Sequence, residues 1–171
     1  GGTYTVSVEY KSTSTDNNMA VGLVLGASKD AAGVIDITTA YKMCVYKNVD
    51  RAFFNSCDGA TPRDNGASYS RNYTSVGVTD NSNGWNKMSM TVTKDGVVTL
   101  TVNDVLVYNS KADGKYSKGY IDGYVGLTAT FTGVQLRNFK YIECDEHSYV
   151  ANTTPATCTE AGKVVYTCKC G

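Results

Sequence analysis

The sequence GWNKMSMTVTKDGVVTLTVNDVLVYN spans Gly84 to Asn109 and reads as three short β-strands joined by two tight turns. Apolar and polar residues alternate in each strand, which gives one dry face and one wet face. Asp95-Gly96 and Asn103-Asp104 separate the strands, and Asp-Gly is a strong hairpin signal. The side chains expected on the dry face are Met88, Met90, Val92, Val98, Leu100 and Val102. This meander predicts an antiparallel, all-β protein.

The segments on either side of the meander carry the same pattern. Residues 3–11 alternate cleanly, whereas residues 19–25 form a more continuous apolar run that is typical of a central, covered strand. We expect further strands at residues 34–38, 40–46, 51–57, near 69–78, 124–131 and 134–142. Roughly ten to twelve short strands at regular spacing predict an antiparallel β-sandwich.

Composition excludes several classes of protein. The 171 residues carry 16 basic and 16 acidic side chains and no long basic run, so nothing indicates a nucleic-acid partner. No apolar run approaches the ~18 residues of a transmembrane helix, so membrane insertion is not expected. The chain opens within a strand pattern, at Gly1-Gly2-Thr3-Tyr4, and we interpret it as a piece of a longer protein.

The sequence of the expected C-terminal strands resembles that of a known group of β-sandwich domains. The meander is followed by GYVGLTA at residues 123–129 and FTGVQLRNFKY at residues 131–141. This order resembles the C-terminal half of the concanavalin A-like, or laminin-G-like, jelly rolls, and is similar to bacterial family 66-type carbohydrate-binding modules. The resemblance implies a jelly-roll β-sandwich over residues 1–142, and it makes a structural calcium ion plausible because many jelly rolls carry one.

Residues 143–171 form a different segment. They contain His147-x-Tyr149, Pro155-x-x-Cys158-Thr159-Glu160-x-Gly162 and Tyr166-Thr167-Cys168. These features resemble an incomplete Cys-rich repeat of surface proteins from gut Firmicutes. The resemblance implies a short appendage and an extracellular or cell-surface location, in a monomeric module of a multidomain chain.

The six cysteines leave alternatives open. Cys44 and Cys57 flank an expected turn, where a cross-strand disulfide and two buried thiols are equally compatible with the sequence. The second group contains Cys144, His147, Cys158, Cys168 and Cys170, and it suits disulfides, thiols or a zinc site. An appendage of fewer than about 30 residues needs some such staple because it buries little core.

Catalytic constellations are scarce. Jelly-roll glucanases resembling this fold carry Glu-x-Asp-x-x-Glu on one strand, and no such motif occurs here; Glu143, Asp145 and Glu146 have the wrong spacing. His147 lies outside the sandwich, and no G-x-S-x-G or P-loop motif is present. Two aspartates brought together by the fold, Asp36 and Asp122, remain the alternative for glycoside hydrolysis.

Sugar binding needs aromatic rings to stack on sugar faces and planar polar groups to bind hydroxyls. The chain has 13 Tyr, 4 Phe and 1 Trp. Tyr116 and Tyr120 form a second candidate rim, and Trp85, at a strand start, is expected to pack rather than bind. The predicted ligand-binding residues are Tyr41, Tyr46, Arg51, Phe53, Asn55, Tyr69, Arg71 and Tyr73.

These patterns lead to one functional hypothesis and two alternatives. The hypothesis is a non-catalytic carbohydrate-binding module of a larger secreted or surface-attached bacterial protein that acts on glycans. One alternative is a structural or adhesive sandwich without a glycan site, and the other is a divergent glycoside hydrolase that uses aspartates. Fold alone does not choose among them, because this scaffold hosts all three.

Overall fold

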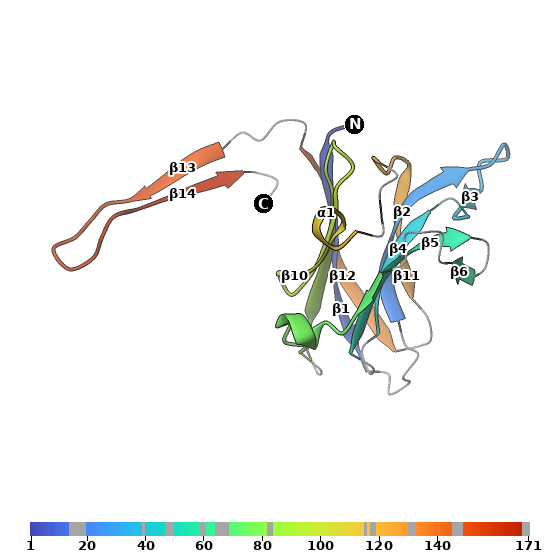
Figure 1. The fold of residues 1–171 in the computed structure, drawn as a ribbon, viewed down its shortest axis with the longest axis horizontal. Helices are drawn as coiled ribbons and strands as arrows, with labels where there is room; N and C mark the ends of the chain where they lie inside the picture. The colour runs from blue at the N-terminus through green and yellow to red at the C-terminus, as the bar shows by residue number, and fades with distance from the viewer. Residues whose placement is uncertain are drawn as a thin grey trace.

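The computed structural model confirms the antiparallel β-sandwich (Figure 1). It describes residues 1–13, 20–38, 40–46, 50–58, 61–63, 69–81, 84–114, 116, 119–129, 133–144 and 149–168. A five-stranded sheet has the order β10-β9-β8-β1-β12. Its strands are β1 (Thr3–Ser12), β8 (Asn86–Val92), β9 (Val98–Val102), β10 (Val105–Asn109) and β12 (Val134–Cys144).

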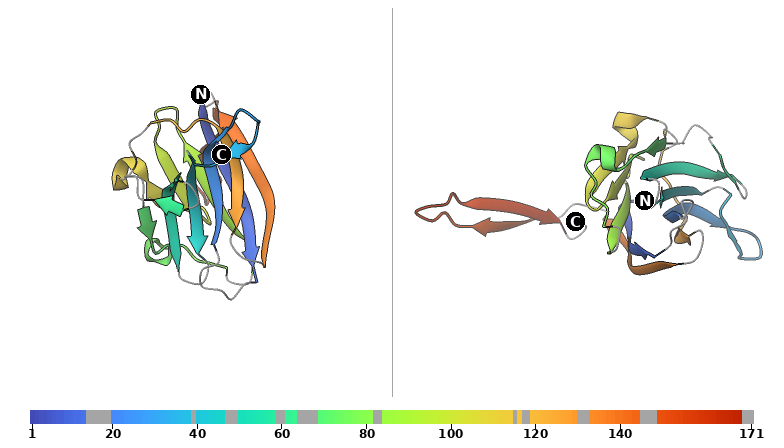
Figure 2. Two further views of the ribbon diagram at one scale, coloured as in Figure 1. Left: turned by 90° about the vertical axis from the view of Figure 1, so that its right-hand side faces the viewer. Right: turned by 90° about the horizontal axis from the view of Figure 1, so that it is seen from below.

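The second sheet faces the first and has the order β11-β2-β4-β5-β6, with β3 paired to β2 and β7 paired to β5. The run expected to be central, β2, lies between β11 and β4, as its continuous apolar sequence predicts. The strands are β2 (Ala20–Lys29), β3 (Ile35–Asp36), β4 (Tyr41–Tyr46), β5 (Arg51–Asp58), β6 (Thr61–Arg63), β7 (Tyr69–Arg71) and β11 (Tyr124–Ala129). Figure 2 shows the two layers from two further sides.

The meander forms as predicted and supplies much of the core. Met88 pairs with Val102 and Met90 with Leu100 across β8 and β9, and all four side chains are buried. The turn from β9 to β10 is tight because Asn103 and Asp104 both adopt left-handed backbone angles, with φ of 49° and 63°. Two left-handed residues match the twist of a two-residue hairpin, which favours Asn and Asp there.

The region expected to hold a strand near residues 69–78 is different. Only β7 is extended, and it is followed by a 3-10 helix at Thr74–Val76. Asp50 accepts hydrogen bonds from the backbone N–H and the hydroxyl of Thr74. Gly77, with φ of 88°, then ends the helix. Capping by Asp50 is a contact between distant segments, so strand periodicity alone did not reveal it.

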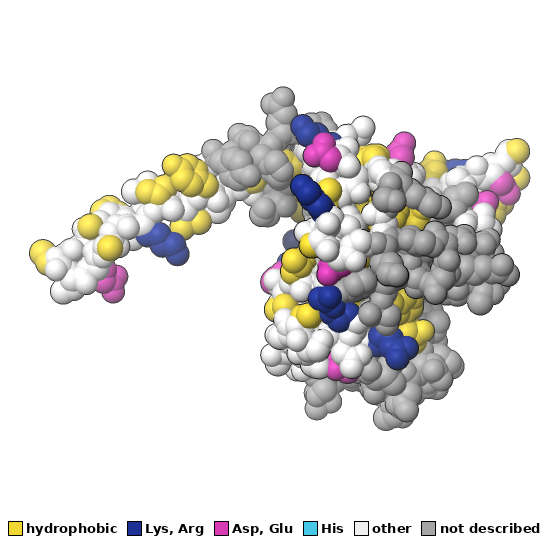
Figure 3. All heavy atoms as spheres, viewed as in Figure 1, with side chains coloured by type: hydrophobic (Ala, Val, Ile, Leu, Met, Phe, Trp, Pro, Cys, Tyr) yellow, Lys and Arg dark blue, Asp and Glu magenta, His cyan; other side chains and the backbone are white. Residues whose placement is uncertain are grey.

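The C-terminal segment forms a separate two-stranded sheet of β13 (Tyr149–Thr154) and β14 (Lys163–Cys168). Figure 1 shows this hairpin projecting away from the sandwich. Figure 3 shows hydrophobic side chains along it, and Val150 and Tyr166 are 61% and 67% exposed. The division into a sandwich of residues 1–142 and an appendage of residues 143–171 stays a prediction, although β12 runs on to Cys144.

The cross-strand disulfide considered for Cys44 and Cys57 is wrong. Cys44 on β4 lies opposite Phe53, and Cys57 is four residues further along β5. At about 3.3 Å per residue this offset is roughly 13 Å, well beyond the ~7 Å limit between bridged Cα atoms. Cys44 is buried, as the alternative of two buried thiols expects; the side chain of Cys57 lies outside the described residues.

The second cysteine group is brought together only in part. Cys144 at the end of β12 is disulfide-bonded, which agrees with the disulfide alternative rather than zinc. The sulfur of Cys168 lies 3.7 Å from that of Cys144, so the base of the hairpin meets the end of the sandwich. Cys158 is exposed in the hairpin loop, and His147 and Cys170 lie outside the described residues.

Candidate functional site

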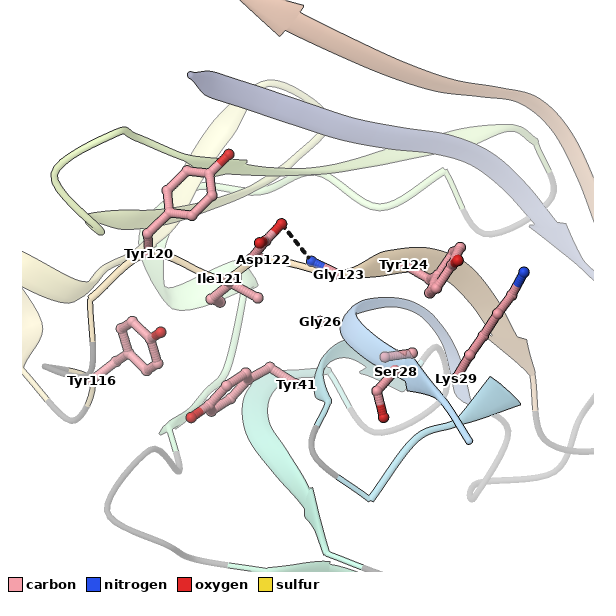
Figure 4. Close-up of a pocket in the computed structure, with 11 residues that line it drawn as sticks. Gly26, Ser28, Lys29, Tyr41, Tyr116, Tyr120, Ile121, Asp122, Gly123 and Tyr124 are labelled. Carbon is pink, nitrogen blue, oxygen red and sulfur yellow. Dashed lines mark hydrogen bonds between the residues drawn. The ribbon is translucent and has the colours of Figure 1, made fainter. Parts of the chain in front are cut away.

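A pocket of about 540 Å³ lies at the end of the sandwich where β2 ends and β11 begins. We call it the end pocket. Its lining combines four tyrosine rings with a lysine, an aspartate and small residues (Figure 4). The lining residues are Gly26, Ala27, Ser28, Lys29, Tyr41, Tyr116, Tyr120, Ile121, Asp122, Gly123 and Tyr124.

A β-bulge shapes the floor of the end pocket. Tyr124 pairs with Ala27, but Val125 pairs with Leu25, so Gly26 is an extra residue in β2. Gly26 has φ of 78°, and a Cβ there would lie 2.8 Å from the side chain of Ile121. Glycine at this position therefore permits both the left-handed backbone and the close approach of the loop before β11.

One wall of the end pocket is an aromatic cluster that continues into the core. Tyr41 meets Tyr116 edge to face, with ring centroids 5.1 Å apart, and stacks on Phe54 at 5.7 Å. The Tyr116 hydroxyl donates to the Gly119 carbonyl at 2.7 Å. Burial raises the pKa of both Tyr41 and Tyr116, so both phenols stay protonated at neutral pH. This wall is pre-formed, because each ring is held by its neighbours.

The opposite wall is more exposed. The Lys29 ammonium lies 4.7 Å from the ring centroid of Tyr124, and Tyr124 is 47% exposed. Asp122, which is exposed, accepts a hydrogen bond from the Gly123 N–H at 2.9 Å through one carboxylate oxygen. Figure 4 shows Asp122 and Ile121 between this wall and the Tyr41–Tyr116 wall. A ring face, an ammonium donor and a carboxylate acceptor therefore line one concave surface.

The eight predicted ligand-binding residues are not brought together at one site. Tyr41 lies on the inner face of its sheet and lines the end pocket. Tyr46 and Phe53 stack on the outer face with centroids 5.1 Å apart, and exposed Arg51 lies opposite Tyr46. The expected sharing of one face by alternate hairpin residues is thus confirmed for these three, with the Lys42 ammonium 5.8 Å from the Phe53 ring.

The remaining predicted residues lie elsewhere. Arg71 forms an ion pair with Asp113 at 3.2 Å. Tyr73 is only 2% exposed and belongs to the hydrophobic core, which removes its ring from any ligand surface. Asn55 and Tyr69 occupy β5 and β7, and their side chains lie outside the described residues.

Sequence reasoning anticipated Tyr116 and Tyr120 but missed Lys29 and Tyr124 as site residues. The available signal was the pair of glycines, Gly26 and Gly123, that flank the two strand ends. A Cβ on Gly123 would lie 2.7 Å from the Ala27 carbonyl oxygen, so close backbone approach requires glycine. Only the pairing of β2 with β11 shows that these two glycines meet.

The expected burial of Trp85 is only partly observed. Trp85 is partly exposed on the outer surface of the five-stranded sheet, where Arg137 covers its ring.

The two aspartates considered for catalysis lie in different surroundings. Asp122 lines the end pocket, whereas Asp36 accepts a hydrogen bond from the Thr38 N–H, which lowers its carboxyl pKa. The lowered carboxyl pKa favours the ionised form of Asp36 over the protonated form that a general acid needs.

Metal ligands do not cluster in the part of the chain that the structure describes: no three His, Cys, Asp or Glu side chains there form a group. Structural calcium stays a prediction. The described residues also contain no helix that is long and apolar enough to cross a membrane.

The two facing antiparallel sheets define a jelly-roll β-sandwich. The carbohydrate-binding module CBM66 from Bacillus subtilis has this fold: it matches 84% of this chain and 76% of its own length, with a TM-score of 0.56 and 14% sequence identity. The binding domain of botulinum neurotoxin serotype D matches 85% of this chain and 34% of its own, with a TM-score of 0.50 and 15% identity.

A more distant match is sheep galectin-11, with a TM-score of 0.43, 10% identity and coverage of 80% of this chain and 91% of its own. No protein-family model matches the chain, and no curated protein is matched by sequence. The predicted jelly-roll β-sandwich is confirmed as a fold shared with CBM66, while the resemblance of residues 143–171 to a surface-protein repeat stays a prediction.

Proposed function

We propose that this chain is a non-catalytic carbohydrate-binding module and that the end pocket is its glycan site. The observation that best supports this proposal is the lining of that pocket, in which four tyrosine side chains, Lys29 and Asp122 surround one concave surface. Apolar sugar faces pack on such rings, while ammonium and carboxylate groups bind hydroxyls. That these groups already line one cavity supports the proposal.

The same proposal covers the setting of the module. It acts outside the cell, as part of a larger secreted or surface-attached bacterial protein that acts on glycans, and holds that protein on its polymer. The fold shared with CBM66 supports this proposal. The exposed carboxylate of Asp122 serves as an acceptor for sugar hydroxyls rather than as a catalytic acid.

The test is a glycan array that includes plant, mucin and fructan glycans, followed by calorimetric titration of the best ligand. Tyr124→Ala and Asp122→Asn should each weaken binding about tenfold, which corresponds to about 1.4 kcal/mol, without changing the melting temperature. Tyr166→Ala is the matched control, because this tyrosine is 67% exposed on the hairpin far from the pocket. Retention of no glycan would favour a spacer or protein-adhesion role, whereas equal binding by all variants would place the glycan site outside the end pocket.

A further inference from the structure

A second cluster of aromatic and planar polar side chains lies on the outer surface of the five-stranded sheet. The Arg137 guanidinium stands 3.9 Å from the ring centroid of Trp85. Glu9 accepts a hydrogen bond from Arg137 Nε at 2.6 Å and another from Asn138 Nδ2 at 3.0 Å. We call these four residues, Trp85, Arg137, Asn138 and Glu9, the Trp85 platform.

A β-bulge in β12, with a left-handed backbone angle at Asn138, positions the side chains of the Trp85 platform. Ser7 pairs with Lys140 but Glu9 pairs with Arg137, so β12 contains an extra residue at this point. Asn138 adopts φ of 54° there, a left-handed angle that costs about 1 kcal/mol or more for a residue with a Cβ. Bulges of this kind re-aim side chains and are enriched beside functional sites. Here the bulge brings Arg137 and Asn138 to the same carboxylate.

Hydrogen bonds join described residues on either side of Trp85. Asn86 is buried; its side chain accepts from the Asn81 N–H at 2.8 Å and donates to the Asn81 carbonyl at 3.0 Å. Asn103 donates to the Asn86 side chain at 2.8 Å from the neighbouring turn. These bonds hold the chain on both sides of Trp85, so the partly exposed ring and the guanidinium that packs on it are ordered before any ligand binds, which lowers the entropy cost of binding.

The Trp85 platform offers hydrogen-bonding groups that its own contacts leave available. Among the described residues, neither terminal amino group of Arg137 makes a hydrogen bond, and the side-chain carbonyl of Asn138 accepts none. Glu9 offsets the charge of Arg137, which favours a neutral polyhydroxylated ligand over an anion. A guanidinium donor and an amide acceptor beside an indole ring suit neighbouring sugar hydroxyls.

We propose that the Trp85 platform is a second glycan-contact surface, separate from the end pocket, so that the module is bivalent toward a polysaccharide. This inference rests on the proposed function for the class of its ligand. The two sites lie at opposite ends of β1: Tyr4 contacts the pocket loop through the Ile121 carbonyl, whereas Tyr10 pairs with Asn86 next to Trp85. Tyr10 lies six residue steps along the strand from Tyr4, which is roughly 20 Å.

A bivalent module should bind long ligands with higher affinity than short ones. A polymer that reaches both sites gains affinity through effective concentration, whereas an oligosaccharide of a few residues occupies one site at a time. We expect the polymer to bind at least tenfold more tightly per chain than its trisaccharide, and each single-site variant to lose that advantage.

Trp85 is the only tryptophan of the chain, so tryptophan fluorescence reports on this surface alone. The full chain is titrated with levan, xylan and gastric mucin, and with fructo- and xylo-oligosaccharides. We expect a blue shift and at least a twofold fall in acrylamide quenching with one polymer. The response should persist in Tyr124→Ala and disappear in Asn138→Gly, since glycine keeps the left-handed backbone but removes the amide.

Affinity electrophoresis in the same polymers supplies the second measurement. Asn138→Gly and Trp85→Ala should each reduce retention at least tenfold, while Thr99→Ala, on the outer face of β9 in the same sheet, should not. Retention without any fluorescence change, or a response lost in Tyr124→Ala, would overturn the second surface and leave the end pocket standing. Absence of retention and of any fluorescence response with every probe would overturn both proposals.

Discussion

Tyr4 and Tyr120 pack edge to face, with ring centroids 5.8 Å apart and planes at 86°. Their hydroxyls tie two distant segments together: Tyr4 donates to the Ile121 carbonyl at 2.7 Å, and Tyr120 donates to the Gly2 carbonyl at 2.8 Å. The first strand therefore holds the loop that forms the end pocket. Pocket geometry and sandwich stability are coupled at this point.

Removing one hydroxyl tests this coupling. Tyr4→Phe leaves the buried Ile121 carbonyl without this donor, and we expect the free energy of unfolding to fall by about 1–3 kcal/mol. Glycan affinity at the end pocket should fall as well, because the Ile121 segment loses its anchor. Urea denaturation and calorimetric titration measure the two effects. Tyr166→Phe removes an exposed hydroxyl and should change neither; an unchanged stability in Tyr4→Phe would refute the anchoring role.

Alanine substitutions at two glycines distinguish the cost of backbone strain from the cost of a steric clash. Gly26 and Gly33 both have left-handed angles, with φ of 78° and 83°, but a Cβ meets Ile121 at 2.8 Å in the first and nothing within 4 Å in the second. Alanine at either position should cost about 1 kcal/mol for the backbone alone. Gly26→Ala should lose at least about 1 kcal/mol more and weaken glycan binding. Equal losses in urea denaturation would show that the β2 bulge tolerates a side chain.

The Trp85 platform should respond to acid. Hydrogen bonds from Asn138 and Arg137 lower the Glu9 carboxyl pKa below its ordinary value, and solvent around the partly exposed Glu9 side chain keeps the effect small. A lowered folded-state pKa means that the stabilisation is complete above the unfolded pKa of about 4.3 and is lost as the pH falls through the folded value.

Acid titration of Trp85 fluorescence checks this expectation. The emission of native protein should change as the pH falls through the lowered Glu9 pKa, because protonated Glu9 releases Arg137 from its ordered position over the ring. Glu9→Gln should show no such acid step while circular dichroism stays that of a β-sandwich. A step of the same size in Glu9→Gln would assign the titration to another carboxyl group.

The hairpin and the sandwich should differ in local stability. The hydrophobic core cluster has its members between Tyr4 and Ile121 and includes no residue of β13 or β14. A two-stranded sheet without a covering layer is marginally stable in water. Amides of β13 and β14 should therefore exchange hydrogen on the order of 100-fold faster than those of β1 and β8. Equal protection would mean that the exposed hairpin side chains are covered in solution.

Sequence periodicity predicted the sandwich because strand patterning acts locally. Met88, Met90 and Leu100 lie on the apolar face of their strands. A one-residue shift in strand register would turn all three toward solvent, so burial of this face fixes the register. The 3-10 helix at Thr74–Val76 escaped prediction because Asp50, more than twenty residues earlier, caps it. The local sequence pattern does not indicate a hydrogen-bond partner that lies so far away in the chain.

The candidate sites were harder to predict than the fold. Tyrosines alternate with apolar residues in both core and surface strands, so pattern alone does not separate buried Tyr73 from the pocket-lining Tyr41. Lys29, Asp122 and Tyr124 meet only because β2 pairs with β11 across a bulge. Trp85 and Arg137 likewise come together through a bulge at Asn138, a position with no distinctive local sequence.

The chain enters the sandwich at Thr3 and leaves it at Cys144, and these two residues are register partners on β1 and β12. Entry and exit therefore lie side by side at one end of two antiparallel neighbours. A pulling force applied through both ends of the domain would load the hydrogen bonds between β1 and β12 one at a time, like opening a zipper, instead of shearing them together. The sandwich should thus yield at low force, and its two ends span a gap small enough for the domain to sit within a loop of another protein.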